Sequence, residues 1–462
     1  MTRTAESTGL ALAHAVLIAI GLGSAAFCVY SAASHKSHLA VRIAPAVLGM
    51  AAPLLLMLRP AIRMMVASAT IGLGVGLYAA QLFALALTDP ERPALQAIQK
   101  EAKEAHVPYD GRTRVETIVA LRAHGIHAEP PFYPYLLLDS PLLVDGEPTI
   151  ALGSIARTTT VCCNEGGQYL IYETDEHGFP NPPNSWSEGV DMAIIGGSGA
   201  VSESVPQADG IPALMRARYP RTVTLGAGGN GPLLELATIR EYLPALKPRQ
   251  VLWLFSESHS PEYLVSESRS EALMRYLNGS YQQHLIAKQD ALNGAIAKYF
   301  DDGVQAEEVA ESWSSAARNF AFLKSVRTLL YYFVTARTRH PEPVAFDPVL
   351  FEKILKEGKR EIGAWGGSVT AIYFPDSSRY AGICNYSPEL RQIYDHTHDM
   401  FLNAASDAQI PVIDLTKAFP DLPASEAAAE APYFYPYPAH MKPAGYHRAA
   451  NAILASLPAS QP

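Results

Sequence analysis

The sequence predicts an α/β domain with a parallel sheet covered by helices on both faces, preceded by transmembrane helices. The first observation is that apolar residues crowd into the part of the 462-residue chain before Asp89. The second is an alternation, from Val190 onward, of short β-rich runs with helical stretches. The third is that glycine and polar residues directly follow the β-rich runs, where such sheets collect their functional groups.

The membrane part is predicted from three apolar runs. Gly9–Ala33 contains no Asp, Glu, Lys or Arg, and at about 1.5 Å per residue it can cross a hydrocarbon core of roughly 30 Å. A signal peptide is the alternative for this run, although its apolar stretch is long for one. Met64–Leu87 is a second full-length run. The shorter Ile43–Leu58, which contains Pro45 and Pro53, is interpreted as a weaker span or as a re-entrant or interfacial segment.

Basic residues near the ends of these runs predict the orientation of the chain. With the N-terminus in the cytoplasm, the inside carries Arg3, Arg59 and Arg63, and the outside carries Lys36 and Arg42. About three helices within residues 1–88 then place the rest of the chain outside the cytoplasm. We therefore expect a protein of the inner (cytoplasmic) membrane whose C-terminal domain is periplasmic.

The composition excludes several classes of partner. The net charge is -9, and no block of Lys and Arg suggests binding to nucleic acid. The four cysteines are too few for a disulfide scaffold, and no Cys or His spacing is typical of a zinc site. We expect neither a metal nor a cofactor.

Residues 89–187 are expected to connect the membrane part to the α/β domain. Two amphipathic helices are predicted in this segment: Pro93–His106 and Arg112–His124. Short strand-like pieces and the adjacent residues Cys162 and Cys163 follow. Adjacent cysteines rarely bond each other, because the resulting ring is strained. One of them can pair with Cys384 in an oxidising compartment; the alternative is that both are buried free thiols.

The α/β domain is predicted over residues 188–462. Five β-rich runs are the candidate strands: Val190–Ile195, Arg221–Leu225, Val251–Phe255, Val369–Phe374 and Pro411–Leu415. Four helix-like segments lie between and after them: Ile211–Tyr219, Leu233–Leu246, Glu389–Ala408 and Pro443–Leu457. Largely apolar strands that alternate with helices imply a parallel sheet covered on both faces.

A helical insertion over about residues 260–366 separates the third candidate strand from the fourth. It is predicted to be helical from Glu271 to Phe300 and from Glu307 to Thr338. Within it, Phe320–Val334 is strongly apolar. Burial of this stretch against the sheet is the first interpretation, and contact with the membrane or a lid over a pocket are the alternatives.

Two glycine-rich turns follow the first two candidate strands. The first, Gly196–Gly199, presents Ser198 on a tight turn between strand and helix, where a serine can act as a nucleophile. The second, Gly226–Gly231, has backbone N–H groups that a ligand oxygen can approach closely, as in an oxyanion hole. A phosphate-binding loop is the alternative for the second turn, but no lysine follows it in the required position.

Two further polar features come later in the chain. The third candidate strand is followed by Ser256–Ser260, in which His259 can donate a hydrogen bond or act as a base. A solvated loop is the alternative for this stretch. His440 directly precedes the closing helix, which can fold back over the sheet edge and bring the imidazole to an early serine.

The order of these four features resembles blocks I, II, III and V of the SGNH (GDSL) hydrolases. The flanking stretches Tyr172–Pro182, Leu225–Tyr242 and Lys442–Ala449 are similar to those of membrane-anchored bacterial members. The resemblance extends over roughly Tyr172–Leu457. It implies a three-layer, flavodoxin-like domain that hydrolyses or transfers an acyl group through an acyl-enzyme.

The resemblance also implies a role for individual residues. Ser198 would be the nucleophile and His440 the general base. The N–H groups of Ser198 and of Gly229 or Gly228 would form the oxyanion hole, with His259 as a further donor. Four residues are expected to contribute to binding around this centre: Gly228, Asn230, Glu257 and Ser258. Orientation of His259 or His440 is one interpretation of Glu257, and a structural hydrogen bond is the other.

The sequence departs from the family at three positions. Gly197 replaces the block I aspartate, and His259 replaces the block III asparagine. The acid expected two or three residues before His440 falls on Pro438 or Tyr437. Loss of the acid of a catalytic triad costs about 10⁴ in rate in one well-studied case, and loss of one oxyanion donor costs about 10²–10³.

Two functions therefore remain open at the level of sequence. One is a membrane-anchored extracytoplasmic esterase or O-acyl (acetyl) transferase that acts on cell-surface carbohydrate esters through a Ser198–His440 dyad. The alternative is a catalytically degenerate domain that binds a glycan or a partner protein in envelope assembly. The expected partners are an acyl ester or glycan and the lipid bilayer, and a transferase would also need a partner protein in the membrane.

Overall fold

The computed structural model describes the greater part of the chain, in two compact units. The described residues are 10–11, 13–15, 18, 56–87, 92–104, 106–187, 189–311, 320, 323–327, 329–330, 347–381, 386–421, 433–435 and 440–458. Unit 1 comprises Met1–Asp89 with Ala310–Thr338, and unit 2 comprises Pro90–Val309 with Arg339–Pro462. The predicted spans Gly9–Ala33 and Ile43–Leu58 lie almost entirely outside the described residues.

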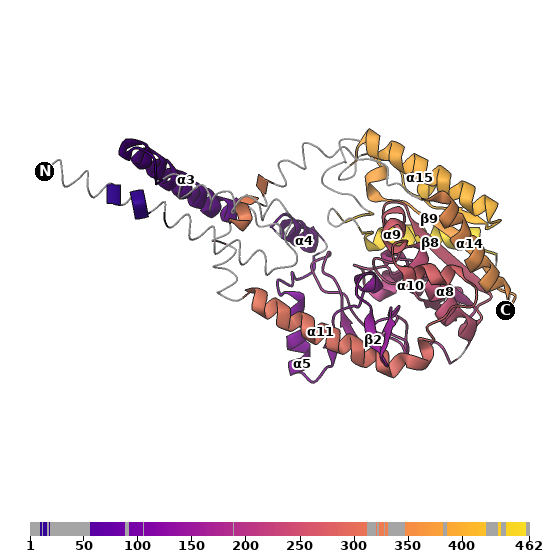
Figure 1. Cartoon of the computed structure of the whole chain (residues 1–462). Helices are drawn as coiled ribbons and strands as arrows, with labels where there is room; N and C mark the ends of the chain where they lie inside the picture. Colours follow the sequence, from indigo (N-terminus) through magenta and orange to yellow (C-terminus); the bar gives the residue numbers. More distant parts are fainter. Residues whose placement is uncertain are drawn as a thin grey trace. The chain divides into compact units, whose positions relative to one another are not determined.

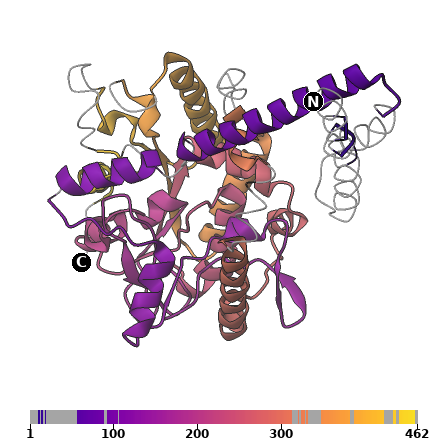
Figure 2. The same cartoon turned by 90° about the vertical axis from the view of Figure 1, so that its left-hand side faces the viewer.

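Unit 1 is built around the long helix α3, Pro60–Leu87 (Figure 1, Figure 2). It begins four residues before the predicted run, because proline is well tolerated in the first turn of a helix. Its stretch Pro60–Ala84 is the one helix in the described part of the chain that is long and apolar enough to cross a membrane. Most of its large apolar side chains are exposed, as lipid contact would require.

Unit 2 contains a five-stranded parallel sheet that confirms the predicted strands. Its strands are β6 (Met192–Ile195), β7 (Thr222–Thr224), β8 (Gln250–Ser256), β9 (Ser368–Phe374) and β10 (Val412–Asp414). They lie in the order β7-β6-β8-β9-β10, and each neighbouring pair is parallel. This is the flavodoxin-like order, in which ligands bind where the connections diverge, at the carboxyl ends of the first and third strands.

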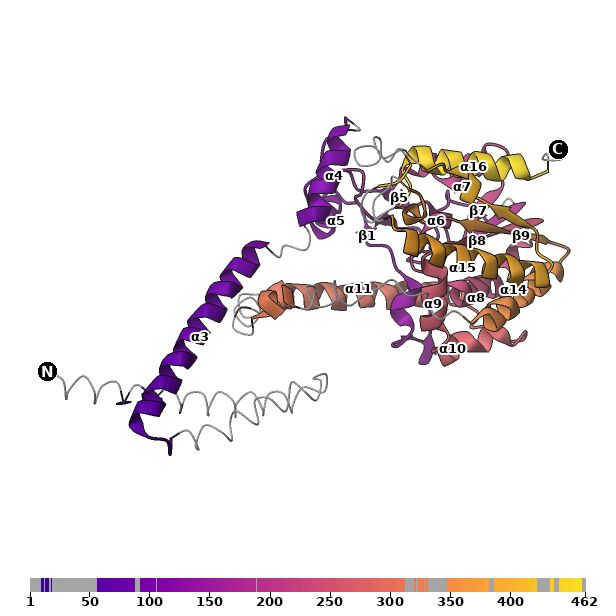
Figure 3. The same ribbon diagram turned by 90° about the horizontal axis from the view of Figure 1, so that it is seen from above.

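Helices cover both faces of this sheet, so the domain has three layers (Figure 3). On one face lie α8 (Pro232–Leu246), α14 (Pro348–Gly363) and α15 (Pro388–Asp407). On the other lie α6 (Ser198–Val201), α7 (Ile211–Arg216) and α16 (Pro443–Ser456). Alternate residues of each strand point into the two cores, which is why the strand sequences are largely apolar.

The middle segment is part of unit 2 and adds two small sheets to it. Its helices are α4 (Arg92–Glu104) and α5 (Arg114–Ala123), close to the predicted bounds. Its strands are β1 (Ala128–Glu129), β2 (Leu142–Val144), β3 (Glu147–Thr149), β4 (Thr159–Val161) and β5 (Ile171–Glu173). Asn181 joins this segment to the main sheet, because its side chain donates to Thr224 O and accepts from Thr224 N, each at 2.8 Å.

The insertion begins with α9 (His259–Glu267), α10 (Glu271–Met274) and α11 (Gln289–Glu311). The stretch from Glu271 to Phe300, predicted to be mostly helical, comprises α10, the 3₁₀ helices Arg275–Leu277 and Ile286–Lys288, and the first part of α11. A loop interrupts it between the two 3₁₀ helices. The side chain of Glu241 accepts hydrogen bonds from the backbone N–H groups of Gln283 and Leu285, which fixes this stretch as a loop. Six short 3₁₀ helices are described in unit 2: Pro134–Leu137, Gln207–Asp209, Arg275–Leu277, Ile286–Lys288, Ser377–Arg379 and Thr416–Ala418.

Candidate active site

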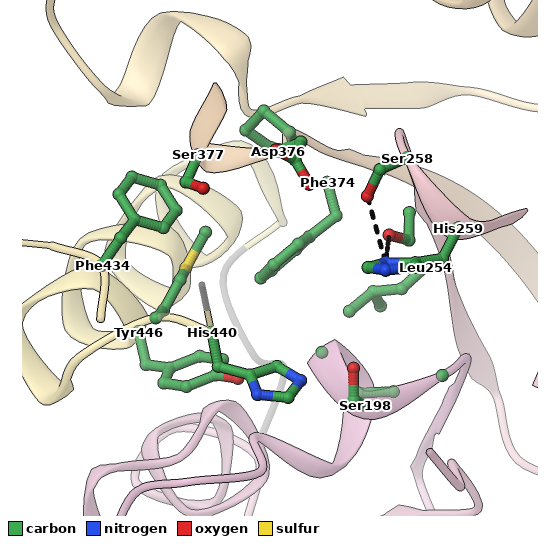
Figure 4. A pocket seen from close by; sticks show the side chains of 16 residues that line it. Ser198, Leu254, Ser258, His259, Phe374, Asp376, Ser377, Phe434, His440 and Tyr446 are labelled. Atoms are coloured by element: carbon green, nitrogen blue, oxygen red, sulfur yellow. Dashed lines mark hydrogen bonds between the residues drawn. The ribbon is translucent and has the colours of Figure 1, made fainter. Parts of the chain in front are cut away.

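Four of the residues predicted from the sequence line one cavity at the carboxyl ends of β6 and β8. Ser198, Ser258, His259 and His440 all contribute to its wall, together with Asp376 (Figure 4). The cavity measures about 620 Å³ with its open mouth included. The tertiary structure thus brings together the hydroxyl and the two imidazoles that the sequence places far apart.

Ser198 lies at the start of α6, directly after the turn that ends β6. Gly196 in this turn has φ +155°, and a Cβ atom there would lie 3.0 Å from the Cβ atoms of both Ala200 and Leu254. A side chain at this position would therefore push the turn away from the sheet. The glycine allows the chain to reverse tightly enough to present the Ser198 hydroxyl to the cavity.

His440 is held by backbone pairing just before α16. Tyr435 N donates to His440 O, and Lys442 N donates to Tyr433 O, both at 2.8 Å. These bonds fix a two-stranded bridge around His440 before Pro443 begins the helix. The pairing fixes the backbone from which the imidazole projects into the cavity (Figure 4).

The acid that the sequence lacks near His440 is supplied by the middle segment. Glu165 Oε1 lies 2.6 Å from His440 Nδ1, and the Glu165 side chain is only 7% exposed. Ser204 Oγ lies 3.3 Å from the same nitrogen. Because Nδ1 is engaged by the carboxylate, Nε2 is the nitrogen left to exchange a proton with a nucleophile.

The surroundings of His440 favour its charged form. Burial by itself would lower the pKa of this imidazole, but the hydrogen bond and negative charge of Glu165, with the charge of Glu203, raise the pKa to about 9. At neutral pH the pair is therefore an imidazolium beside a carboxylate. The imidazole must lose its proton before it can serve as a base.

Ser198 and His440 face the same cavity without a hydrogen bond between them in this structure. Catalytic hydrogen bonds are often long in the absence of substrate and tighten when it binds. A protonated imidazole also has no lone pair on Nε2 with which to accept the serine proton. The absence of a hydrogen bond between Ser198 and His440 agrees with the raised pKa of His440.

His259 begins α9 and lies at the mouth of the cavity. Its Nδ1 lies 3.0 Å from Ser258 Oγ, and its ring stacks on Tyr263 with centroids 5.6 Å apart. Loss of surrounding water lowers the pKa of His259, so the ring is neutral at pH 7. If the Ser258 hydroxyl donates to Nδ1, the ring proton is on Nε2, which can then donate a hydrogen bond.

The glycine turn after β7 lies next to the serine turn but does not line the cavity. Ala227 N donates to Gly196 O at 3.2 Å, which ties the two turns together. Gly229 has φ +77°, and a Cβ atom there would lie 2.2 Å from the ring of Tyr135. Gly228 is similarly covered by Glu203 and Tyr133.

Asn230 follows these glycines and is buried, 2% exposed. Neither polar atom of its side chain has a hydrogen-bond partner among the described residues. Gly228, Gly229 and Asn230 thus lie behind the serine turn, and none of them forms part of the cavity wall.

Glu257 is buried in an ion pair away from the cavity. Its carboxylate pairs with Arg379 and accepts from Tyr373 Oη at 2.7 Å and from Asp376 N at 2.9 Å. Every described contact of this side chain is therefore structural. These contacts agree with the structural interpretation of Glu257, and its binding role stays a prediction.

Cys162 and Cys163 are free thiols whose sulfur atoms lie 2.8 Å apart. Their expected partner, Cys384, lies outside the described residues. Ser204 Oγ donates to Cys163 Sγ at 3.7 Å and also lies 3.3 Å from His440 Nδ1, so Cys163 is close to this imidazole.

Glu165 was not predicted from the sequence. The family resemblance places the acid two or three residues before His440, whereas Glu165 lies 275 positions away. The one local signal for Glu165 was weak. This glutamate follows two cysteines and lies among short strand-like pieces, in a segment that was expected only to connect two parts of the chain.

The chain is similar to solved structures of esterases. No family model matches the chain, and no curated protein matches its sequence. The acetyl xylan esterase AlAXEase is similar with a TM-score of 0.32 and 11% identity, over 58% of this chain and 99% of that one.

Two further solved structures are similar to a comparable extent. A catalytic mutant of Axe2, an acetylxylan esterase from Geobacillus stearothermophilus, has a TM-score of 0.29 and 13% identity, over 59% of this chain and 98% of that one. A GDSL-like lipase from Bacteroides thetaiotaomicron has a TM-score of 0.26 and 10% identity, over 57% of this chain and 86% of that one. The structural neighbours of this chain are thus SGNH/GDSL-like esterases.

Proposed function

We propose that unit 2 is a serine esterase or O-acyl transferase with a Ser198–His440–Glu165 triad. The contact of 2.6 Å between Glu165 Oε1 and His440 Nδ1 is the observation that carries the proposal. A buried carboxylate at this nitrogen fixes the tautomer of the imidazole and stabilises the imidazolium that forms during acyl transfer. The acid comes from a different part of the chain than the family pattern suggests, but its chemical role is the same.

The reaction begins when Ser198 Oγ attacks the acyl carbon of an ester and His440 Nε2 takes the serine proton. The oxygen of the tetrahedral intermediate accepts hydrogen bonds from Ser198 N and from His259 Nε2, with Gly229 N as a further donor after movement of the glycine turn. His440 then returns the proton to the departing alkoxide, which leaves an acyl-enzyme. Water or a sugar hydroxyl attacks that ester next, with His440 again as the base.

The substrate class we propose is an acyl ester of a carbohydrate outside the cytoplasm. The supporting observations are the membrane-type helix α3 and the open cavity, which has both polar and apolar walls (Figure 4). Hydrolysis of an acetylated glycan, together with preferential binding of the acetylated form over the unmodified glycan, would support this class. Equal binding of both forms without turnover would favour the alternative, a domain that only binds glycans.

A fluorophosphonate probe tests the serine hydrolase directly, because it labels only an activated serine. We expect labelling of the parent protein, loss of labelling in Ser198→Ala, and unchanged labelling in Ser266→Ala, which alters an exposed serine of α9. Absence of labelling in the parent over the whole range up to about pH 10 would contradict the proposal. So would equal labelling of Ser198→Ala.

A further inference from the structure

Helix α3 carries a buried amide in an otherwise apolar sequence. Gln81 is 1% exposed, whereas Leu82 and Phe83, which follow it, are 60% and 67% exposed. An amide withdrawn from water costs free energy unless its donor and acceptor are both paired, and a bilayer offers no water to pair them. The described contacts of Gln81 therefore identify what packs on this side of the helix.

The partner of Gln81 is the apolar stretch of the insertion, 244 positions later in the chain. Gln81 Nε2 donates to Ser325 Oγ at 3.2 Å, and Gln81 Oε1 accepts from Val326 N at 3.1 Å. One turn earlier on α3, the ring of Tyr78 stacks on Phe320 with centroids 5.6 Å apart. Both halves of the amide are thus satisfied by one short segment.

These contacts change the interpretation of the insertion. Burial of its apolar stretch against the sheet was the first expectation, but Phe320, Ser325 and Val326 contact α3, and Ala310–Thr338 belongs to unit 1. The chain consequently passes between the two units three times, after Asp89, after Val309 and after Thr338. Three covalent connections join unit 2 to unit 1, where a simple N-terminal anchor would supply one.

The position of Gln81 fixes the depth of this contact. It lies three residues before Ala84, where the apolar stretch of α3 ends, which is about 5 Å along a helix axis. That end of a span lies near the lipid headgroups. The segment itself exposes apolar Leu330, at 58%, and basic Lys324, a combination that suits the boundary between headgroups and acyl chains of anionic lipids.

We propose that the segment around Phe320–Leu330 is a second membrane contact of this chain. It docks on α3 through Gln81 and lies in the headgroup region of a bilayer that contains anionic phospholipid. The inference does not depend on the triad, because it rests on contacts within unit 1 alone.

Photo-crosslinking to lipid tests the membrane contact in the full-length protein. A benzophenone amino acid is placed at position 330, at position 82 of α3, or at position 349 of unit 2, where Val349 is 71% exposed. The protein is reconstituted in nanodiscs of phosphatidylethanolamine and phosphatidylglycerol, and lipid adducts are counted by mass spectrometry. We expect adducts at positions 82 and 330 that exceed those at 349 by about tenfold or more, since only the first two positions contact lipid.

Two results would overturn the proposal. One is a lipid signal at position 330 no greater than at 349, and the other is absence of adducts at position 82. Crosslinking of the same variants in native membranes shows whether lipid or a protein lies against position 330. An adduct with another protein in place of lipid would assign this surface to a protein partner and refute lipid contact.

Hydrogen exchange tests the docking through Gln81. In Gln81→Leu the N–H of Val326 loses its acceptor, so we expect its exchange to become about tenfold faster. Leu82→Ala is the matched control, since it alters an exposed neighbour on the same helix and should leave exchange at Val326 unchanged. Equal exchange rates at Val326 in the parent and in Gln81→Leu would show that the segment does not dock in this way.

Discussion

The Glu165 carboxylate and the His440 imidazole are in contact at 2.6 Å, although the two residues are 275 positions apart in the chain. Glu165 comes from the segment that precedes the α/β domain, and His440 comes from the loop before its last helix. Two segments of unit 2 that are distant in the sequence therefore meet at this imidazole. Removal of residues 89–187 would remove the acid along with the connection.

Replacement of the acid should lower activity without removing the nucleophile. In Glu165→Gln we expect the rate of ester hydrolysis to fall by up to about 10⁴, as in other triads that lose the acid. Hydrolysis of p-nitrophenyl acetate measures this. Glu176→Gln is the matched control in the same segment. Its carboxylate accepts hydrogen bonds from the backbone N–H groups of Asn184 and Trp186, so this glutamate has a structural role. A parent-like rate in Glu165→Gln would show that the contact is not catalytic.

The pKa of His440 predicts an alkaline activity profile. Because the base must be neutral and its pKa is raised to about 9, labelling by a fluorophosphonate should increase as the pH rises through about 9. Glu165→Gln removes the charge that raises this pKa, so the rise should move toward the ordinary histidine value of 6.5. A profile that is flat above about pH 7 in the parent would contradict the assignment.

The same ion pair should make stability depend on pH. The pKa of His440 is higher in the folded protein than the ordinary histidine value of 6.5, so the stabilisation is fully present below pH 6.5 and is lost as the pH rises through about 9. Thermal unfolding between about pH 6 and pH 10 measures the loss. His440→Gln should flatten this part of the curve, and an equal slope in both proteins would exclude the pair as its source.

His259 is expected to act as a donor to the oxyanion. Replacement by alanine should lower kcat by about 10²–10³ with little change in KM, because the interaction forms mainly in the transition state. His259→Asn should recover part of the loss, since its side-chain amide also offers an N–H group. Equal activity in the alanine and asparagine variants would assign His259 to the structure of α9 and not to the reaction.

The buried pair of Glu257 and Arg379 should contribute to stability and not to chemistry. In Arg379→Met the Glu257 carboxylate, fully buried in the pair, loses its counter-charge, so we expect a loss of about 3–5 kcal/mol in the free energy of unfolding. Urea unfolding measures this loss, and fluorophosphonate labelling of the folded protein should remain. Arg391→Met, which breaks an exposed pair with Asp421, should cost about 1 kcal/mol or less.

The strands and most helices of unit 2 could be predicted because their patterns are local. Strands β6, β8 and β9 are largely apolar runs with buried residues on both faces of the sheet, so their composition alone identifies them. The loop between α10 and α11 could not be predicted in this way. Its path is fixed by the side chain of Glu241, which lies on a different helix.

The sequence by itself predicted a candidate nucleophile, a candidate base and the edge of the sheet at which they lie. Ser198 and His259 follow strands of one parallel sheet, and such strands end at a common edge. Only the tertiary structure decided which acid completes the site and which segment satisfies Gln81. Both pairings are contacts between residues that are distant in the sequence. A buried polar group can pair with any suitable group that packing brings within hydrogen-bond distance, so the spacing of residues along the chain does not predict its partner.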